Sequence, residues 1–163
     1  MKLLFVDDEH WAYGSIIEEV RRKRHEIVVC GRDATQVLHT LGAQGLRSGE
    51  EYGPQPEPPP PYDLIVLDIM MPVGLEGDPG GLLDIWEFQN AGVGLYTLIR
   101  TRDLGWGSWV SNVKVLVFTA DNLDETYDQL CSVPNTKEGV NFEIVYKPDD
   151  RIAKRICSFL GED

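Results

Sequence analysis

The chain has 163 residues, 42% of them hydrophobic, and a formal net charge of −12. This length and composition suit one globular domain, residues 1–163, that buries its core without disulfides or structural metals. The negative charge argues against direct nucleic-acid binding, because a basic patch is needed to neutralise phosphates. The first apolar run is interrupted after four residues by Asp7, and no other run approaches membrane-spanning length, so we expect a cytoplasmic protein without membrane insertion.

Five short apolar runs recur along the chain and predict five strands. Their near-continuous apolar character indicates strands buried on both faces, as in a parallel sheet. The runs are Leu3 to Val6, Ile27 to Cys30, Leu64 to Leu67, Val113 to Phe118, and Phe142 to Val145.

Segments with helical spacing follow most of these runs. In the first, Tyr13, Ile16, Ile17 and Val20 share one face, and similar stripes begin at Ala34, Leu123 and Ile152. We place a further helix near Leu95 to Arg102. Strands alternating with helices predict a doubly wound α/β sheet, whose ligand site lies beyond the carboxyl ends of the strands.

Two stretches interrupt the alternation and are predicted to be loop insertions. The first, about 42–62, carries four consecutive prolines, which cannot continue a helix. The second, about 72–94, is rich in glycine, with a short amphipathic piece around Leu82 to Phe88. The second insertion begins four residues after Asp68, at the end of a predicted strand where a ligand site is expected. We therefore expect this insertion to govern partner choice or access to that site more than it governs stability.

Polar residues end four of the predicted strands on the same edge of the sheet. Asp7 and Asp8 follow the first run, Asp68 the third, Thr119 the fourth and Lys147 the fifth. Each alone has a plainer interpretation as a helix cap, a turn residue or a solvated charge. Together, three packed carboxylates repel one another and favour a hard cation such as Mg²⁺, beside the fixed positive charge of Lys147.

Four segments resemble the receiver domains of two-component signalling, and the resemblance covers the chain apart from the two insertions. They are Phe5-Val6-Asp7-Asp8-Glu9, Leu67-Asp68-Ile69-Met70-Met71-Pro72, Phe118-Thr119-Ala120 and Tyr146-Lys147-Pro148. The resemblance implies a flavodoxin-like, five-stranded parallel sheet in the order 2-1-3-4-5. It also implies a response regulator that catalyses only its own phosphorylation and dephosphorylation.

The same resemblance assigns roles to the strand-end residues. Asp68 would accept a phosphoryl group, with Mg²⁺ bound by Asp8, Asp68 and the backbone carbonyl of Met70, and with Asp7 acting directly or through a water. Thr119 and the Ala120 N–H would hold the phosphoryl group, and Lys147 would offset its charge.

The implied partners are a histidine kinase or phosphotransfer protein and a downstream protein target, and a homodimer is compatible with the resemblance. Only Gly161, Glu162 and Asp163 follow the last helix, so we expect output to pass through that partner.

One feature departs from the receiver pattern. Receivers often carry an aromatic switch residue three positions before the lysine, and Ile144 stands there, with Tyr146 two residues on. The usual coupling between the threonine and that aromatic residue is therefore in question.

Two other functions remain open from the sequence. A pseudo-receiver would keep the acidic pocket but act only as a protein-binding adaptor. A phosphatase of the haloacid dehalogenase type would also use an aspartyl nucleophile, but Asp68-Ile69-Met70 lacks the second acid of its Asp-x-Asp motif.

Overall fold

The computed structural model describes residues 1–43, 61–74, 91–101, 105, 109–120 and 124–161. Its centre is a five-stranded sheet in the order β2-β1-β3-β4-β5, with every neighbouring pair parallel. The strands are β1 (Lys2–Val6), β2 (Glu26–Cys30), β3 (Leu64–Leu67), β4 (Lys114–Thr119) and β5 (Phe142–Tyr146). The predicted sheet and strand order are confirmed, and each predicted strand overlaps an observed one.

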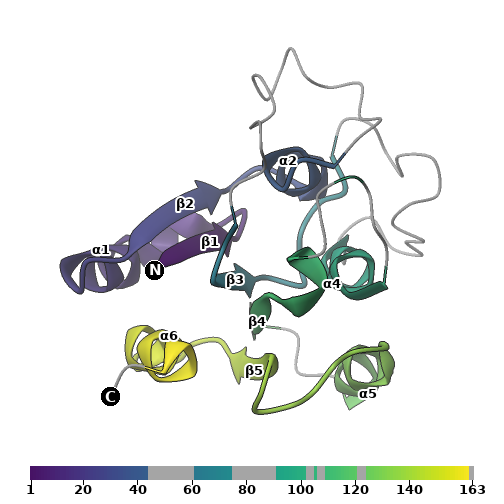
Figure 1. Cartoon of the computed structure of the whole chain (residues 1–163). Helices are drawn as coiled ribbons and strands as arrows, with labels where there is room; N and C mark the ends of the chain where they lie inside the picture. Colours follow the sequence, from purple (N-terminus) through teal and green to yellow (C-terminus); the bar gives the residue numbers. More distant parts are fainter. Residues whose placement is uncertain (44–60, 75–90, 102–104, 106–108, 121–123, 162–163) are drawn as a thin grey trace.

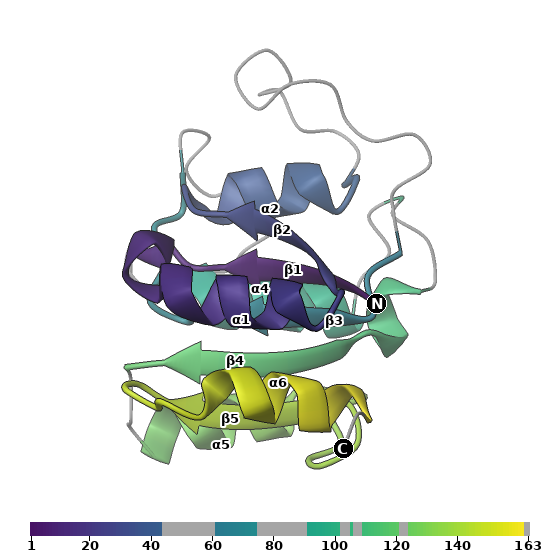
Figure 2. The same ribbon diagram turned by 90° about the vertical axis from the view of Figure 1, so that its left-hand side faces the viewer.

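Helices cover both faces of the sheet (Figure 1). One face carries α1 (Gly14–Arg22), preceded by the short 3-10 helix η1 (His10–Tyr13), and α6 (Ile152–Leu160). Figure 2 shows α1 and α6 together in front of the sheet, with all strand arrows pointing the same way. The opposite face carries α2 (Ala34–Thr40), α4 (Ala91–Thr101) and α5 (Asp124–Ser132).

Two apolar layers result, one on each side of the sheet. Alternate residues of β1 divide between them: Leu3 and Phe5 face α1 and α6, whereas Leu4 and Val6 face α2 and α4. This division follows from the two-residue period of a strand. All four residues of β3 are buried, as expected for the central strand of a doubly covered sheet.

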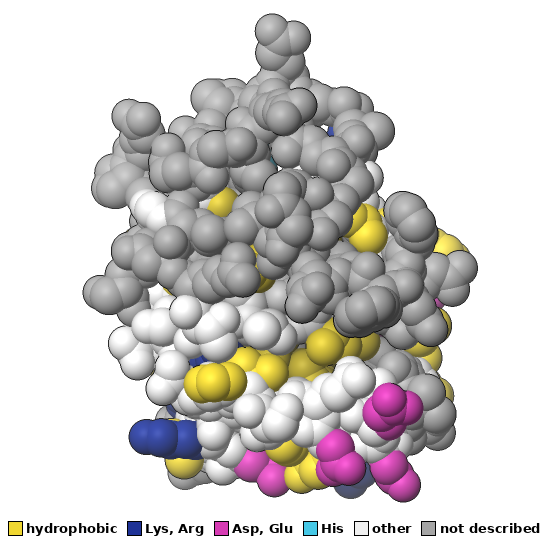
Figure 3. All heavy atoms as spheres, turned by 90° about the vertical axis from the view of Figure 1, so that its right-hand side faces the viewer, with side chains coloured by type: hydrophobic (Ala, Val, Ile, Leu, Met, Phe, Trp, Pro, Cys, Tyr) yellow, Lys and Arg dark blue, Asp and Glu magenta, His cyan; other side chains and the backbone are white. Residues whose placement is uncertain are grey.

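Local sequence signals fix several helix ends. The Asp33 side chain accepts a hydrogen bond from the Gln36 N–H at 2.8 Å and caps the start of α2. Gly161 ends α6 with a φ of 91°, a left-handed conformation that glycine adopts without strain. In Figure 3, acidic side chains gather over α5, whose first turn carries Asp124 and Glu125, where a helix dipole favours negative charge.

Helix α4 begins at Ala91 rather than at Leu95, so the loop predicted to run to about Gly94 ends sooner. The glycines of this segment favour a loop by propensity, but at position 92 the packing of the helix requires a residue without a side chain. A Cβ on Gly92 would lie 2.4 Å from the carbonyl oxygen of Asp68 and 2.5 Å from the Cα of Ile69. Glycine therefore serves close approach of the helix to the β3 loop.

The remaining parts of the two predicted insertions, including the amphipathic piece Leu82 to Phe88, lie mostly outside the described residues. Within the part of the chain that the structure describes, no helix is both long and apolar enough to cross a membrane.

Candidate functional site

The carboxyl ends of β1 and β3 bring two aspartates side by side. Val6 and Leu67 are paired in the parallel register, and the Asp68 N–H donates to the Val6 carbonyl at 2.9 Å. Asp7 and Asp68, the next residue on each strand, are 1% and 4% exposed. The edge position predicted for both acids is therefore confirmed, and both are buried.

Lys147 joins this pair from the end of β5. Its backbone N–H donates to the Thr119 carbonyl at 2.8 Å, which continues the pairing of β5 with β4. Its ammonium lies 2.7 Å from Oδ2 of Asp7 and 2.7 Å from Oδ2 of Asp68. The Lys147 side chain is 8% exposed, so the charges interact away from bulk water.

Asp8 completes a cluster of three carboxylates. One oxygen from each of Asp7, Asp8 and Asp68 lies within 4.8 Å of the others. Three carboxylates and the one ammonium of Lys147 leave a formal charge of −2 when all are ionised, which a divalent cation would balance. The cluster therefore fits a hard, oxygen-preferring cation in both ligand type and charge.

The excess negative charge also shifts proton affinities. Burial raises the pKa of Asp7, and the charge of Asp68 adds to the rise, while Lys147 only partly opposes it. Burial alone would lower the pKa of Lys147, but its hydrogen bonds to Asp68 and Asp7 outweigh this and raise it. The cluster therefore favours the protonated form of Lys147, whereas ionising the Asp7 carboxyl in the folded protein costs more free energy than ionising it in water.

The loop that follows Asp68 is fixed by backbone contacts. The Met70 N–H donates to Oδ1 of Asp68 at 3.0 Å, so this carboxylate is oriented by its own turn. From α4, the Ala91 and Gly92 N–H groups donate to the carbonyls of Met71 and Ile69, both at 3.1 Å. The N-terminus of α4 therefore braces the segment that carries the buried acid.

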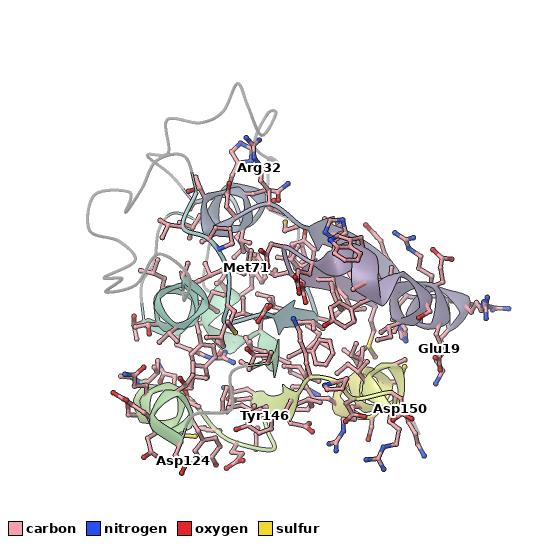
Figure 4. All side chains as sticks on the ribbon, turned by 180° about the vertical axis from the view of Figure 1, so that it is seen from behind. Glu19, Arg32, Met71, Asp124, Tyr146 and Asp150 are labelled. Atoms are coloured by element: carbon pink, nitrogen blue, oxygen red, sulfur yellow. The ribbon has the colours of Figure 1, made fainter. Side chains whose placement is uncertain are left out.

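The start of α2 braces the same loop further on. The Ala34 N–H donates to the Pro72 carbonyl at 3.0 Å, and the Thr35 N–H and hydroxyl donate to the Val73 carbonyl at 3.2 and 3.0 Å. In Figure 4, which looks onto the edge where the strands end, Met71 lies between α2 and α4.

A cavity of about 610 Å³ opens above the acids. Its wall includes Asp8, Asp68, Met70, Ala120 and Lys147, all predicted from the sequence. Thr119, also predicted from the sequence, is 1% exposed. It is the last residue of β4 and directly precedes Ala120 in the sequence. The structure thus places all seven predicted site residues at one edge of the sheet, and their chemical roles stay predictions.

Two aromatic residues at the site were not predicted. The sequence pattern places Tyr13 on the apolar face of the first helix and Phe118 at the end of a strand, beside Thr119, and indicates no contact of either ring with Lys147. Tyr13 also lines the cavity, and the Lys147 ammonium lies 5.0 Å from the centre of its ring and 5.3 Å from that of Phe118. No periodicity reveals these contacts, because three separate elements supply them.

The position of the usual receiver aromatic differs here, as the sequence indicates. Ile144 is half-buried and packs against the layer under α2 and α4, whereas Tyr146 is 43% exposed. Tyr146 lies on β5 between α5 and α6 in Figure 4.

Comparison with known proteins finds similarity in structure but not in sequence. No protein-family model matches the chain, and no curated protein matches it. A phosphorylated cyanobacterial phytochrome response regulator aligns over 98% of this chain and 92% of its own, with 17% identity and a TM-score of 0.62. A Francisella response-regulator receiver domain aligns over 98% and 96%, with 18% identity and a TM-score of 0.57.

A third solved structure is the Mn²⁺-bound form of a response regulator, Rcp1. It aligns over 98% of this chain and 89% of its own, with 18% identity and a TM-score of 0.60. Together with the sheet order, these alignments establish that the chain has the flavodoxin-like fold of response-regulator receiver domains.

Proposed function

We propose that this protein is a phosphoacceptor receiver in a two-component phosphorelay. Asp68 would take a phosphoryl group from a histidine kinase or phosphotransfer protein, with Mg²⁺, and the resulting change would be signalled to a downstream protein. The observation that carries the proposal is the Lys147 ammonium, which lies 2.7 Å from both Asp7 and Asp68 and belongs to a residue that lines a cavity.

The residues have the chemistry that the reaction needs. A carboxylate oxygen of Asp68 attacks phosphorus, and the bond from phosphorus to the donor nitrogen or oxygen breaks with its electron pair leaving on the donor. The attack brings a carboxylate toward a group already surrounded by negative oxygens. Lys147 is placed to offset that charge, and the Thr119 hydroxyl and the Ala120 N–H are proposed to hold the transferred group.

The metal ligands in this proposal are Asp7, Asp8, Asp68 and the Met70 backbone carbonyl. The fit rests on the three carboxylate oxygens within 4.8 Å and on the uncompensated charge of the cluster. Mg²⁺ bound there would neutralise the carboxylates and the incoming phosphoryl oxygens. The Mn²⁺-bound response regulator is a protein of the same fold with a divalent cation, which supports the choice.

Of the three carboxylates, Asp68 is the proposed acceptor because it follows the central strand and lines the cavity, whereas Asp7 is 1% exposed. The proposal includes action in the cytoplasm and no catalysis beyond the protein's own phosphorylation and dephosphorylation. Whether two copies associate stays a prediction.

The test is incubation with acetyl phosphate and Mg²⁺, followed by measurement of the intact mass. We expect addition of one phosphoryl group to the wild type and none to Asp68→Asn. Asp63→Asn is the matched control, because Asp63 is an exposed acid at the opposite end of β3 and should leave labelling intact. Equal labelling of Asp68→Asn and wild type would remove Asp68 as the acceptor.

An adaptor without phosphorylation is the second candidate. Absence of labelling of the wild type by both acetyl phosphate and phosphorylated kinases would favour it. The phosphatase alternative has no support at the second acid position, where the side chain is that of Met70.

A further inference from the structure

The ammonium of Lys147 is enclosed by aromatic rings as well as by carboxylates. The centres of the Tyr13 and Phe118 rings lie 5.0 and 5.3 Å from Nζ. The two rings contact each other edge to face, with centres 5.1 Å apart and planes inclined by 73°. They come from η1 and β4, whereas Lys147 follows β5, so three elements converge on one charge.

We propose that Tyr13 and Phe118 form an aromatic clamp that positions the Lys147 ammonium for phosphoryl transfer. This inference rests on the proposed function and adds a positioning role for residues outside the acidic cluster and its lysine. An aromatic face attracts a cation through its quadrupole, and the attraction is stronger where water is excluded. At 8% exposure, the Lys147 side chain meets that condition.

The clamp is useful because the other partners of the ammonium change during the reaction. Before phosphorylation, Lys147 bonds to one oxygen each of Asp7 and Asp68. When a phosphoryl group is attached to Asp68, that carboxylate loses its charge and the new oxygens compete for the ammonium. The rings stay the same throughout, so they limit the positions that the flexible lysine stem can adopt.

The two rings differ in how far packing alone explains them. Phe118 is 1% exposed and belongs to the apolar layer under α1 and α6, so its presence needs no functional reason. Tyr13 is half-buried, precedes α1 and lines the cavity, with its ring 6.4 Å from that of Phe5. Tyr13 is therefore the residue whose substitution tests the proposal.

The experiment compares Tyr13→Leu, which removes the aromatic face but keeps an apolar side chain, with Tyr13→Phe, which keeps the ring. We expect Tyr13→Leu to slow phosphorylation by acetyl phosphate roughly tenfold, a factor within the range of a partly desolvated cation–π contact. Tyr13→Phe should recover most of that loss. Tyr127→Leu, the same exchange on α5, is the control and should match the wild type.

A second measurement does not depend on phosphorylation. In the metal-free protein, the side-chain NMR resonances of Lys147 should carry a ring-current shift that Tyr13→Phe keeps and Tyr13→Leu reduces. Lys147→Arg identifies these resonances by their loss. If the wild type takes no phosphoryl group, the proposed function fails, and the clamp is then judged on this shift alone.

The outcomes separate cleanly. A slowed Tyr13→Leu with the Mg²⁺ affinity of the wild type, rescued by Tyr13→Phe, supports the clamp. An unchanged rate in Tyr13→Leu, an equal loss in Tyr13→Phe, or an unchanged Lys147 shift in Tyr13→Leu overturns it. If Tyr13→Leu does not fold, Tyr13→Met replaces it under the same criteria.

Discussion

A buried arginine lies at the amino ends of β4 and β5, at the opposite end of the strands from the acids, and its removal should lower stability. Arg100 on α4 is 1% exposed, and among the described residues it donates to uncharged oxygens. Its guanidinium donates to the carbonyls of Ser111, Val113 and Asn141 at 3.2, 2.7 and 2.6 Å. Its Nε donates to the Tyr96 hydroxyl at 3.3 Å, and the guanidinium carbon lies 5.2 Å from the centre of that ring.

Arg100→Met keeps an apolar stem but removes these donors. The Asn141 carbonyl still accepts from the Val115 N–H at 2.9 Å, so the main loss falls on the buried Val113 carbonyl. At about 1–3 kcal/mol for a buried group that loses its partner, we expect the free energy of unfolding to fall by about 1–3 kcal/mol. For a domain of this size, that lowers Tm by roughly 2–12 °C.

Urea unfolding followed by circular dichroism measures this free energy. Arg151→Met is the matched control, because that arginine side chain is 71% exposed, and we expect it to change stability by less than about 0.5 kcal/mol. Phosphorylation of Arg100→Met below its Tm should stay at the wild-type level, since Arg100 contacts the residues that precede β4 and β5. A loss under about 1 kcal/mol would refute the view that this arginine ties the two strand starts to α4.

Three further predictions concern the acids and the thiols. Asp8→Asn should weaken Mg²⁺ binding, measured by calorimetry, yet leave the metal-free Tm at or above that of the wild type, because it removes charge from a repulsive cluster; a sharp fall would contradict this. The pKa of Asp7 in the folded protein lies above its ordinary value of 3.8. Asp7 therefore contributes its full stability below pH 3.8, and this contribution is lost as the pH rises through the pKa of the folded protein. The metal-free Tm of Asp7→Asn relative to wild type should therefore increase from pH 4 to pH 7, and a flat difference would count against the raised pKa. Burial raises the pKa of Cys30 to about 11, whereas Cys131 is only half-buried, so Cys131 should react first with a thiol reagent at pH 8; faster reaction of Cys30 in peptide mapping would exclude the buried environment.

The elements with a local signal can be predicted from the amino-acid pattern. Five apolar runs predicted the five strands, because a strand covered on both faces must be apolar at nearly every position. The four strand-end residues Asp7, Asp68, Thr119 and Lys147 then followed from the rule that parallel strands present their carboxyl ends at one edge. No distant contact was needed for either inference.

The start of α4 and the surroundings of Lys147 depend instead on packing between distant parts of the chain. The glycines before Leu95 suggest a loop by propensity, but Gly92 lies in a helix because the Asp68–Ile69 backbone leaves no room for a Cβ. The sequence pattern makes Tyr13 one more apolar position of a helix face, yet its ring lies against the ammonium of Lys147, which follows the last strand.

The burial of Arg100 is also not predictable from the sequence pattern. In the sequence it is an ordinary charge near a helix end, and it is buried only because three carbonyls from the starts of β4 and β5 converge on it. Periodicity reports which face of an element is apolar. Which partner a polar or aromatic side chain contacts depends on packing between elements far apart in the chain. The sequence pattern does not encode that packing.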